Sequence, residues 1–122
     1  MSNKIQVSVK TTYMADQSVP PQRYVYSYTI TIANNGSETA QLISRHWRIR
    51  DENDKLQEVQ GMGVVGEQPY IEPGTSYTYS SGVILETETG IMEGSYQMQA
   101  DSGDTFDAEI PAFALVPPHA IH

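Results

Sequence analysis

The chain has 122 residues, with seven Lys and Arg against fifteen Asp and Glu, giving a formal net charge of −8; all seven basic residues lie in residues 1–55. This acidic excess argues against a nucleic-acid binder, which needs several cationic side chains along the phosphates. Cysteine is absent and no apolar run approaches the ~20 residues that span a bilayer, so disulfides, thiolate chemistry and membrane insertion are excluded and a cytoplasmic protein is expected.

Alternating apolar and polar residues predict strands from the N-terminal end onward. Residues 5–9 form the first, and residues 24–32 form a longer one whose buried face carries three tyrosines and two isoleucines. A turn at residues 34–37 then leads to a third strand over residues 41–50. Trp47 in that strand is expected to supply the central aromatic side chain of the core.

The second half of the chain continues the same pattern. Further strands are predicted over residues 55–62, 76–85, 94–101, 105–110 and 113–116. Seven or eight short strands in one chain predict an all-β fold, an antiparallel β-sandwich of immunoglobulin or fibronectin type III-like architecture, with a closed barrel as the alternative. Residues 1–122 are expected to form a single domain, with residues 117–122 as a flexible tail.

The last predicted hairpin permits a register. Ala100 is expected opposite Phe106, which leaves the three-residue loop Ser102-Gly103-Asp104 and a glycine for the left-handed position. In this register the apolar residues of both strands share one face, and Asp107 lies opposite Gln99 on the solvent face.

A glycine motif follows the fourth strand. Gly61, Gly63 and Gly66 match the letters G-x-G-x-x-G, but dinucleotide folds need a helix directly afterwards, and residues 67–74 contain two prolines. Two interpretations stay open. The motif is either a kinked strand end with a tight loop crossing between sheets, or a nest of backbone N–H groups that binds an anion.

The third strand is basic. Alternation puts Arg45 on the core face with Ile43 and Trp47, where an arginine needs a partner, so we expect a salt bridge at the sandwich rim, or alternatively a bound anion. His46, Arg48 and Arg50 point outward. They form either a solvated face or an interaction surface for a phosphate or for the acidic half of a second copy, as in a homodimer.

No catalytic or metal-binding constellation is present in the sequence. The acidic residues of 86–93 and 101–109 have no EF-hand spacing, so they predict diffuse cation attraction rather than a metal site. His119 and His122 lie in the predicted tail without a third ligand. Because no nucleophile elbow, zinc-binding helix motif or P-loop occurs, we expect no enzymatic activity and no cofactor.

The stretch Gly61-Met62-Gly63-Val64-Val65-Gly66-Glu67-Gln68-Pro69, with Tyr28–Ile32, Arg45–Ile49 and Ile110–Leu115, resembles the signature of the bacterial ApaG proteins. The resemblance implies a fibronectin type III-like sandwich and a small cytoplasmic protein, also called CorD, linked to cobalt resistance and magnesium efflux. It implies a protein partner in divalent-cation homeostasis. It also implies phosphate, pyrophosphate or dinucleoside polyphosphate binding at Gly61, Gly63 and Gly66 with Arg45, and it supplies no catalytic residues.

Overall fold

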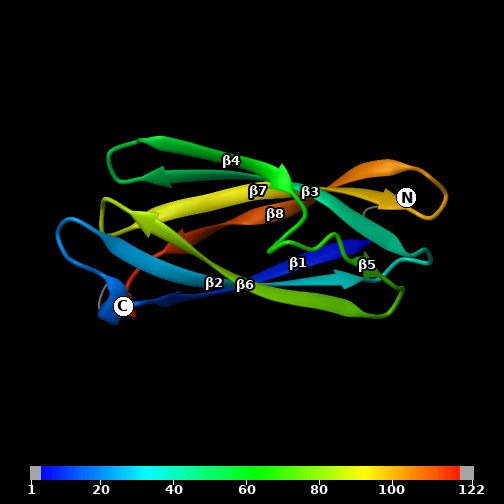
Figure 1. Ribbon diagram of the computed structural model, residues 1–122, viewed down its shortest axis with the longest axis horizontal. Coiled ribbons are helices and arrows are strands. Elements are labelled where there is room, and N and C mark those ends of the chain that lie inside the picture. Colours follow the sequence, from blue (N-terminus) through cyan, green and yellow to red (C-terminus); the bar gives the residue numbers. More distant parts are fainter. Residues whose placement is uncertain (1–3, 119–122) are drawn as a thin grey trace.

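Two antiparallel sheets stacked face to face make up the computed structural model, which describes residues 4–118 (Figure 1). One sheet has the order β1-β2-β6; the other has the order β4-β3-β7-β8, with β5 also paired to β3. The elements are β1 Ile5–Tyr13, the 3₁₀ turn η1 Ala15–Gln17, β2 Tyr24–Asn34, β3 Ala40–Asp51, β4 Leu56–Met62, β5 Tyr70–Ile71, β6 Ser76–Leu85, β7 Gly90–Ala100 and β8 Thr105–Leu115. The predicted all-β sandwich is confirmed. His119, His122 and most of the predicted tail lie outside the described residues.

Aromatic side chains from both sheets fill the centre of the core. Trp47 of β3 is 2% exposed and packs edge-on against Tyr28 of β2, with ring centroids 5.4 Å apart. Phe113 of β8 and Tyr96 of β7 meet the same indole at 5.9 and 6.5 Å. Such edge-to-face contacts add to the burial of aromatic area. The prediction that Trp47 supplies the central core aromatic is confirmed.

Strand β3 changes its inward-facing set partway along. Ala40 and Leu42 are buried at its start, whereas Trp47 and Ile49 are buried after a register shift between Leu42 and Ser44. An extra residue in a strand reverses the faces of everything beyond it, and Ile43, which is only half-buried, occupies that position. The bulge therefore carries Arg45 to the inward side together with Trp47.

The β7–β8 hairpin differs from the predicted register by two residues. Met98, not Ala100, lies opposite Phe106, and the loop consists of residues 101–103. Gly103 has φ +98°, so it occupies the third loop position, where a three-residue loop takes its left-handed residue. The predicted loop, residues 102–104, has Gly103 at its second position, and this is where the prediction is wrong. The shared apolar face is nevertheless right, because a shift of two residues preserves it.

Strand β8 runs straight through Pro111, where two separate strands were predicted. The β7–β8 register shifts between Met92 and Gly94, opposite the Pro111-Ala112 pair. Buried positions accordingly change from Ala108 and Ile110 to Leu115. A proline donates no ladder hydrogen bond and is accommodated at a bulge, so pairing resumes beyond it.

Three tyrosine hydroxyls are bonded inside the protein. The Tyr79 and Tyr96 hydroxyls are 2.5 Å apart, and the Tyr26 hydroxyl donates to the Glu88 carbonyl at 2.6 Å. Burial, as the largest cause, raises the pKa of all three phenols well above the ordinary value of about 10. The folded protein therefore holds these protons more tightly than the unfolded chain does.

This difference predicts alkaline destabilisation. The stability that these phenols contribute is complete below pH ~10 and falls as the pH rises above it, because only the tyrosines of the unfolded chain then ionise. The free energy of unfolding decreases by up to ~1.4 kcal/mol per pH unit for each phenol. Tyr96→Phe should make that slope shallower in urea unfolding between pH 9 and about 11.5. Tyr70→Phe, at an exposed tyrosine, is the control. Equal slopes for the two variants would contradict the assignment.

Candidate functional site

The glycine motif forms the end of β4 and a tight turn. Val64 and Glu67 exchange two backbone hydrogen bonds of 2.8 Å, and the two residues between them have φ values of +42° and +82°. Positive φ at both central positions is the signature of a type I′ turn. Gly63, just before the turn, is also left-handed, with φ +64°. The motif is thus a kinked strand end, as one interpretation expected, but it leads into β5 of the same sheet, so the chain changes sheets only after β5.

Arg45 supports this turn from the neighbouring strand. Its Nη1 donates to the carbonyls of Met62 at 3.1 Å and Gly63 at 2.8 Å. Gly61 lies directly opposite Arg45, and a Cβ there would come within 2.9 Å of the guanidinium nitrogens. The predicted salt bridge for Arg45 is therefore wrong. Because Gly61 has no side chain, the guanidinium lies over the backbone and bonds to carbonyls instead of a carboxylate.

The structure brings Arg45 together with Gly61 and Gly63, while Gly66 lies exposed at the tip of the turn. The Gly63 N–H donates to Ile43, and those of Val64 and Glu67 are used within the turn. Among the residues described, the N–H groups of Val65 and Gly66 donate to no protein atom, nor do Nε and Nη2 of Arg45. These are the donors that the loop and its arginine offer to an acceptor from outside.

The outward side of β3 carries His46, Arg48 and Arg50, and two of these side chains are paired with glutamates. His46 Nε2 lies 2.8 Å from Glu58 Oε1 on β4, and Arg48 Nε lies 3.6 Å from Glu93 Oε2 on β7. Both glutamates come from the acidic half of the chain, so strand pairing cancels part of the charge asymmetry seen in the sequence. Half-exposed pairs of this kind contribute little stability.

Arg50 has different neighbours. It lies opposite Leu56 of β4 and Ile91 of β7, and these two side chains are 42% and 52% exposed. We call Arg50, Leu56 and Ile91 the outer patch. Sequence reasoning missed its two apolar members, although both occupy outward positions of their strands. An exposed arginine between two apolar side chains is typical of protein interfaces, where Arg is enriched and isolated charge pairs are not.

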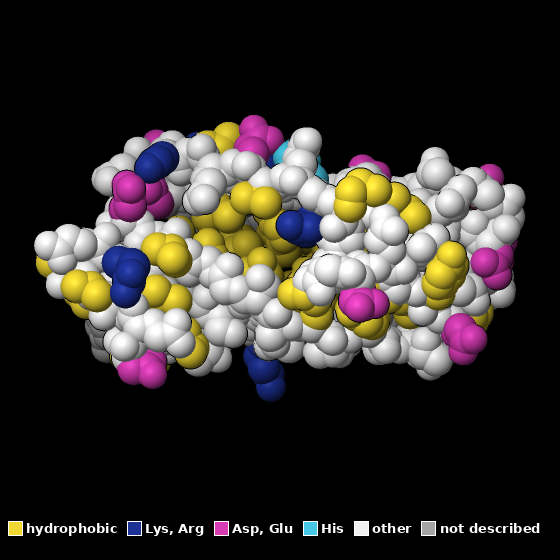
Figure 2. All heavy atoms as spheres, in the orientation of Figure 1, with side chains coloured by type: hydrophobic (Ala, Val, Ile, Leu, Met, Phe, Trp, Pro, Cys, Tyr) yellow, Lys and Arg dark blue, Asp and Glu magenta, His cyan; other side chains and the backbone are white. Residues whose placement is uncertain are grey.

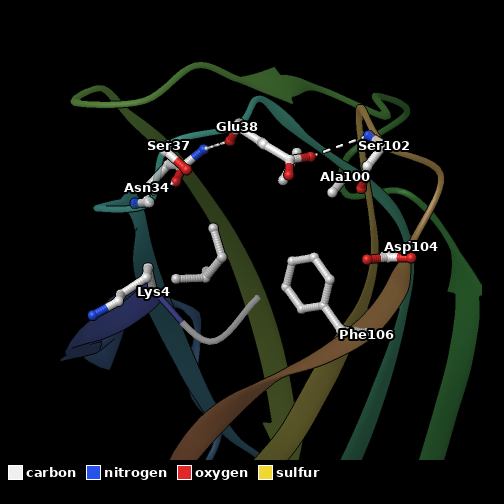
Figure 3. A pocket seen from close by; sticks show the side chains of 11 residues that line it. Lys4, Asn34, Ser37, Glu38, Ala100, Ser102, Asp104 and Phe106 are labelled. Carbon is white, nitrogen blue, oxygen red and sulfur yellow. Dashed lines mark hydrogen bonds between the residues drawn. The ribbon is translucent and has the colours of Figure 1, made fainter. Parts of the chain in front are cut away.

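A small cavity lies where the β2–β3 and β7–β8 loops meet (Figure 3). Its volume is about 100 Å³. Asn34 donates there to the carbonyls of Glu38 and Ile71 and accepts from the Gly36 N–H, while Glu38 accepts from the Ser102 N–H. The polar groups of Asn34 thus join the loops to one another, and the cavity is smaller than typical ligand pockets.

Two kinds of feature are absent from residues 4–118. No three His, Asp or Glu side chains in that range cluster closely enough to hold a metal ion. Within the same range, no helix has the length and apolar character needed to cross a membrane.

Comparison with known proteins identifies close relatives. The family model described as the ApaG domain matches residues 15–100. The curated relatives named Protein ApaG from Thiobacillus denitrificans and Ectopseudomonas mendocina are each 57% identical over 120 residues, covering 98% of this chain and 94% and 95% of theirs. A structural-genomics X-ray structure superimposes with a TM-score of 0.95 at 48% identity, covering 100% of this chain and 93% of that one. A crystal structure from Bordetella pertussis, described as ApaA, gives 0.91 at 45% identity, covering 93% and 94%.

Proposed function

Because the chain belongs to the ApaG family, we propose that it is a non-enzymatic binding module of the cytoplasm that acts in Co²⁺ resistance and Mg²⁺ efflux through a protein partner. The cation role rests on the family resemblance. The binding role is supported by the outer patch, where Arg50 lies between two exposed apolar side chains. A fitting partner surface presents a carboxylate beside an apolar side chain.

Charge reversal within the patch tests this proposal. Arg50→Glu should weaken capture of the partner about tenfold or more, because the variant repels the carboxylate that Arg50 attracts. It should also fail to restore cobalt tolerance to a strain that lacks the gene. Lys10→Glu has the same charge change at an exposed position of β1 in the other sheet and serves as the control.

The outcomes separate the two parts of the proposal. Full complementation by Arg50→Glu would reject the patch as the binding surface, whereas an unchanged cobalt tolerance of the deletion strain would reject the cation role. A second copy of the chain is the alternative occupant. Sedimentation at low and high salt decides this point, since a salt-insensitive monomer excludes an electrostatic homodimer.

Anion binding at the glycine turn is a second candidate. It is favoured by the free donors on Val65, Gly66 and Arg45, which could receive a phosphate, a pyrophosphate or a dinucleoside polyphosphate. Titration with pyrophosphate should shift the backbone amide resonances of residues 61–66. If these resonances do not move at millimolar ligand, this function is excluded.

A further inference from the structure

One side of the sandwich is closed and the other is open. Strand β1 of the first sheet contacts β8 of the second, which covers that side of the core. On the opposite side the edge strands are β4 and β6, and a cleft of about 540 Å³ opens between them. Figure 2 shows it as a hollow between the two layers with a hydrophobic floor and a basic side chain at its rim. We call it the interlayer cleft, and its central lining is Tyr28, Arg45, Trp47, Val59, Ser81 and Val83.

The interlayer cleft has the size and composition of a ligand site. Binding sites for small molecules have volumes of roughly 300–1,000 Å³ and mostly apolar walls with a few polar groups. Here Trp47, Val59 and Val83 supply apolar wall from three strands, and Ser81 adds a hydroxyl. By contrast, the cavity at the loop end holds about 100 Å³, and its Asn34 is fully hydrogen-bonded.

Trp47, one of the lining residues, has an unsatisfied donor. The side chain is 2% exposed, and its Nε1 is the buried side-chain polar atom that lacks a hydrogen-bond partner in the described part of the chain. Leaving a buried donor unpaired costs free energy, and each such group calls for an explanation. An indole N–H can only donate, so whatever satisfies it must present an acceptor.

The charge of the lining selects the sign of the ligand. Among the residues of 4–118 that line the cleft, Arg45 is the one with a charge, although the chain as a whole has a net charge of −8. Its Nη1 is occupied by the two loop carbonyls, while Nε and Nη2 donate to no protein atom within residues 4–118. A guanidinium in a largely apolar cleft binds anions more strongly than it would in open water.

We propose that the interlayer cleft binds a small organic anion with an apolar body. The carboxylate or phosphate group accepts hydrogen bonds from Arg45 and from Trp47 Nε1, and the apolar body lies against the Trp47 ring, Val59 and Val83. This site is distinct from the outer patch, because Arg45 and Trp47 point inward from β3 whereas Arg50 points outward. It also differs from anion binding at the glycine turn, which needs no apolar body.

Trp47 is the only tryptophan in the chain, so its indole N–H resonance and its fluorescence come from this one residue of the cleft lining. Titration with phenylacetate or phenyl phosphate should produce a saturable change in both signals below about 10 mM. The neutral analogue phenylacetamide should bind about tenfold more weakly, because it lacks the charge that Arg45 recognises. Inorganic phosphate should leave the indole signals unchanged.

Two pairs of variants locate the site. Val59→Phe fills the cleft and should abolish the response without disturbing the bonds of Arg45, whereas Leu56→Phe, on the outward face of β4, should preserve it. Arg45→Gln should weaken the binding of phenylacetate but not the binding of phenylacetamide. Arg48→Gln, on the outward side of the same strand, is the control.

Three results would overturn the proposal. They are no saturable change in the Trp47 signals with either anion, equal affinity for phenylacetate and its amide, and unchanged binding by Val59→Phe. A response confined to the amides of residues 61–66 would place anion binding at the glycine turn and reject the cleft. None of these results depends on whether the outer patch binds a partner.

Discussion

Gly94→Ala is expected to lower the free energy of unfolding by about 4 kcal/mol and the melting temperature by about 15 °C. Gly94 lies on β7 opposite Trp47 of β3, in the middle of the larger sheet. A Cβ at this position would be 2.1 Å from the His46 carbonyl oxygen and 3.2 Å from the Trp47 Cα. These atoms belong to the backbone of a central strand, so no side chain can rotate away, and the two strands must separate.

Urea unfolding followed by Trp47 fluorescence measures the loss directly, because the indole lies in the disturbed part of the core. Gly82→Ala on β6 is the matched control. Its Cβ would meet the Tyr26 carbonyl oxygen at 3.5 Å, an ordinary contact, and a change below about 1 kcal/mol is expected. Similar losses for the two variants would show that general strand propensity, and not the close approach of β3 and β7, makes Gly94 necessary.

Gly63→Ala is expected to cost about 3 kcal/mol, from two causes that add. Its φ of +64° is unfavourable for any residue with a Cβ, and that Cβ would be 2.2 Å from the Glu67 carbonyl oxygen. This oxygen accepts the Val64 N–H bond that closes the turn. The variant should therefore open the turn and displace the Gly63 carbonyl that Arg45 holds.

Amide hydrogen exchange at Val64 and Glu67 should accelerate in Gly63→Ala beyond the change in global stability, because the turn opens locally. Gly66→Ala separates the two causes. Gly66 also has a positive φ, +82°, but its Cβ would meet nothing within 4 Å, so only the conformational cost of about 1–2 kcal/mol remains. If both variants lose the same stability, the contact with Glu67 is not what requires glycine at position 63.

Alternation in the sequence was sufficient to predict most strands and their buried faces. The prediction for residues 76–85 has the same bounds as β6, and the five even-numbered residues from Tyr24 to Ile32 do face the core. A period of two carries this information because each residue of a strand points to the side opposite its neighbour's. The same period contains no information about shifts of two residues, and the β7–β8 register was wrong by that amount.

Alternation also does not predict where bulges occur. The shift between Leu42 and Ser44 reverses the faces within β3, and the one opposite Pro111 reverses them within β8. Each depends on how two strands pair, which is a property of the partner as well as of the strand itself. Pro111 marks the second position in the sequence, but a proline is equally compatible with the end of a strand.

The charged residues of β3 show which features follow from alternation in the sequence and which follow from strand pairing. Alternation along the chain predicts that one strand is basic, with Arg45 facing inward and His46, Arg48 and Arg50 facing outward, because side-chain direction follows from strand periodicity. The partners of these side chains follow from how the strands pair in space. Glu58 and Glu93 neutralise two of the outward residues, Leu56 and Ile91 flank the third, and Gly61 allows Arg45 to reach carbonyls beside an open cleft. Neighbours across a sheet come from distant parts of the chain and their order is fixed by how the strands pair, so alternation within one strand contains no information about them.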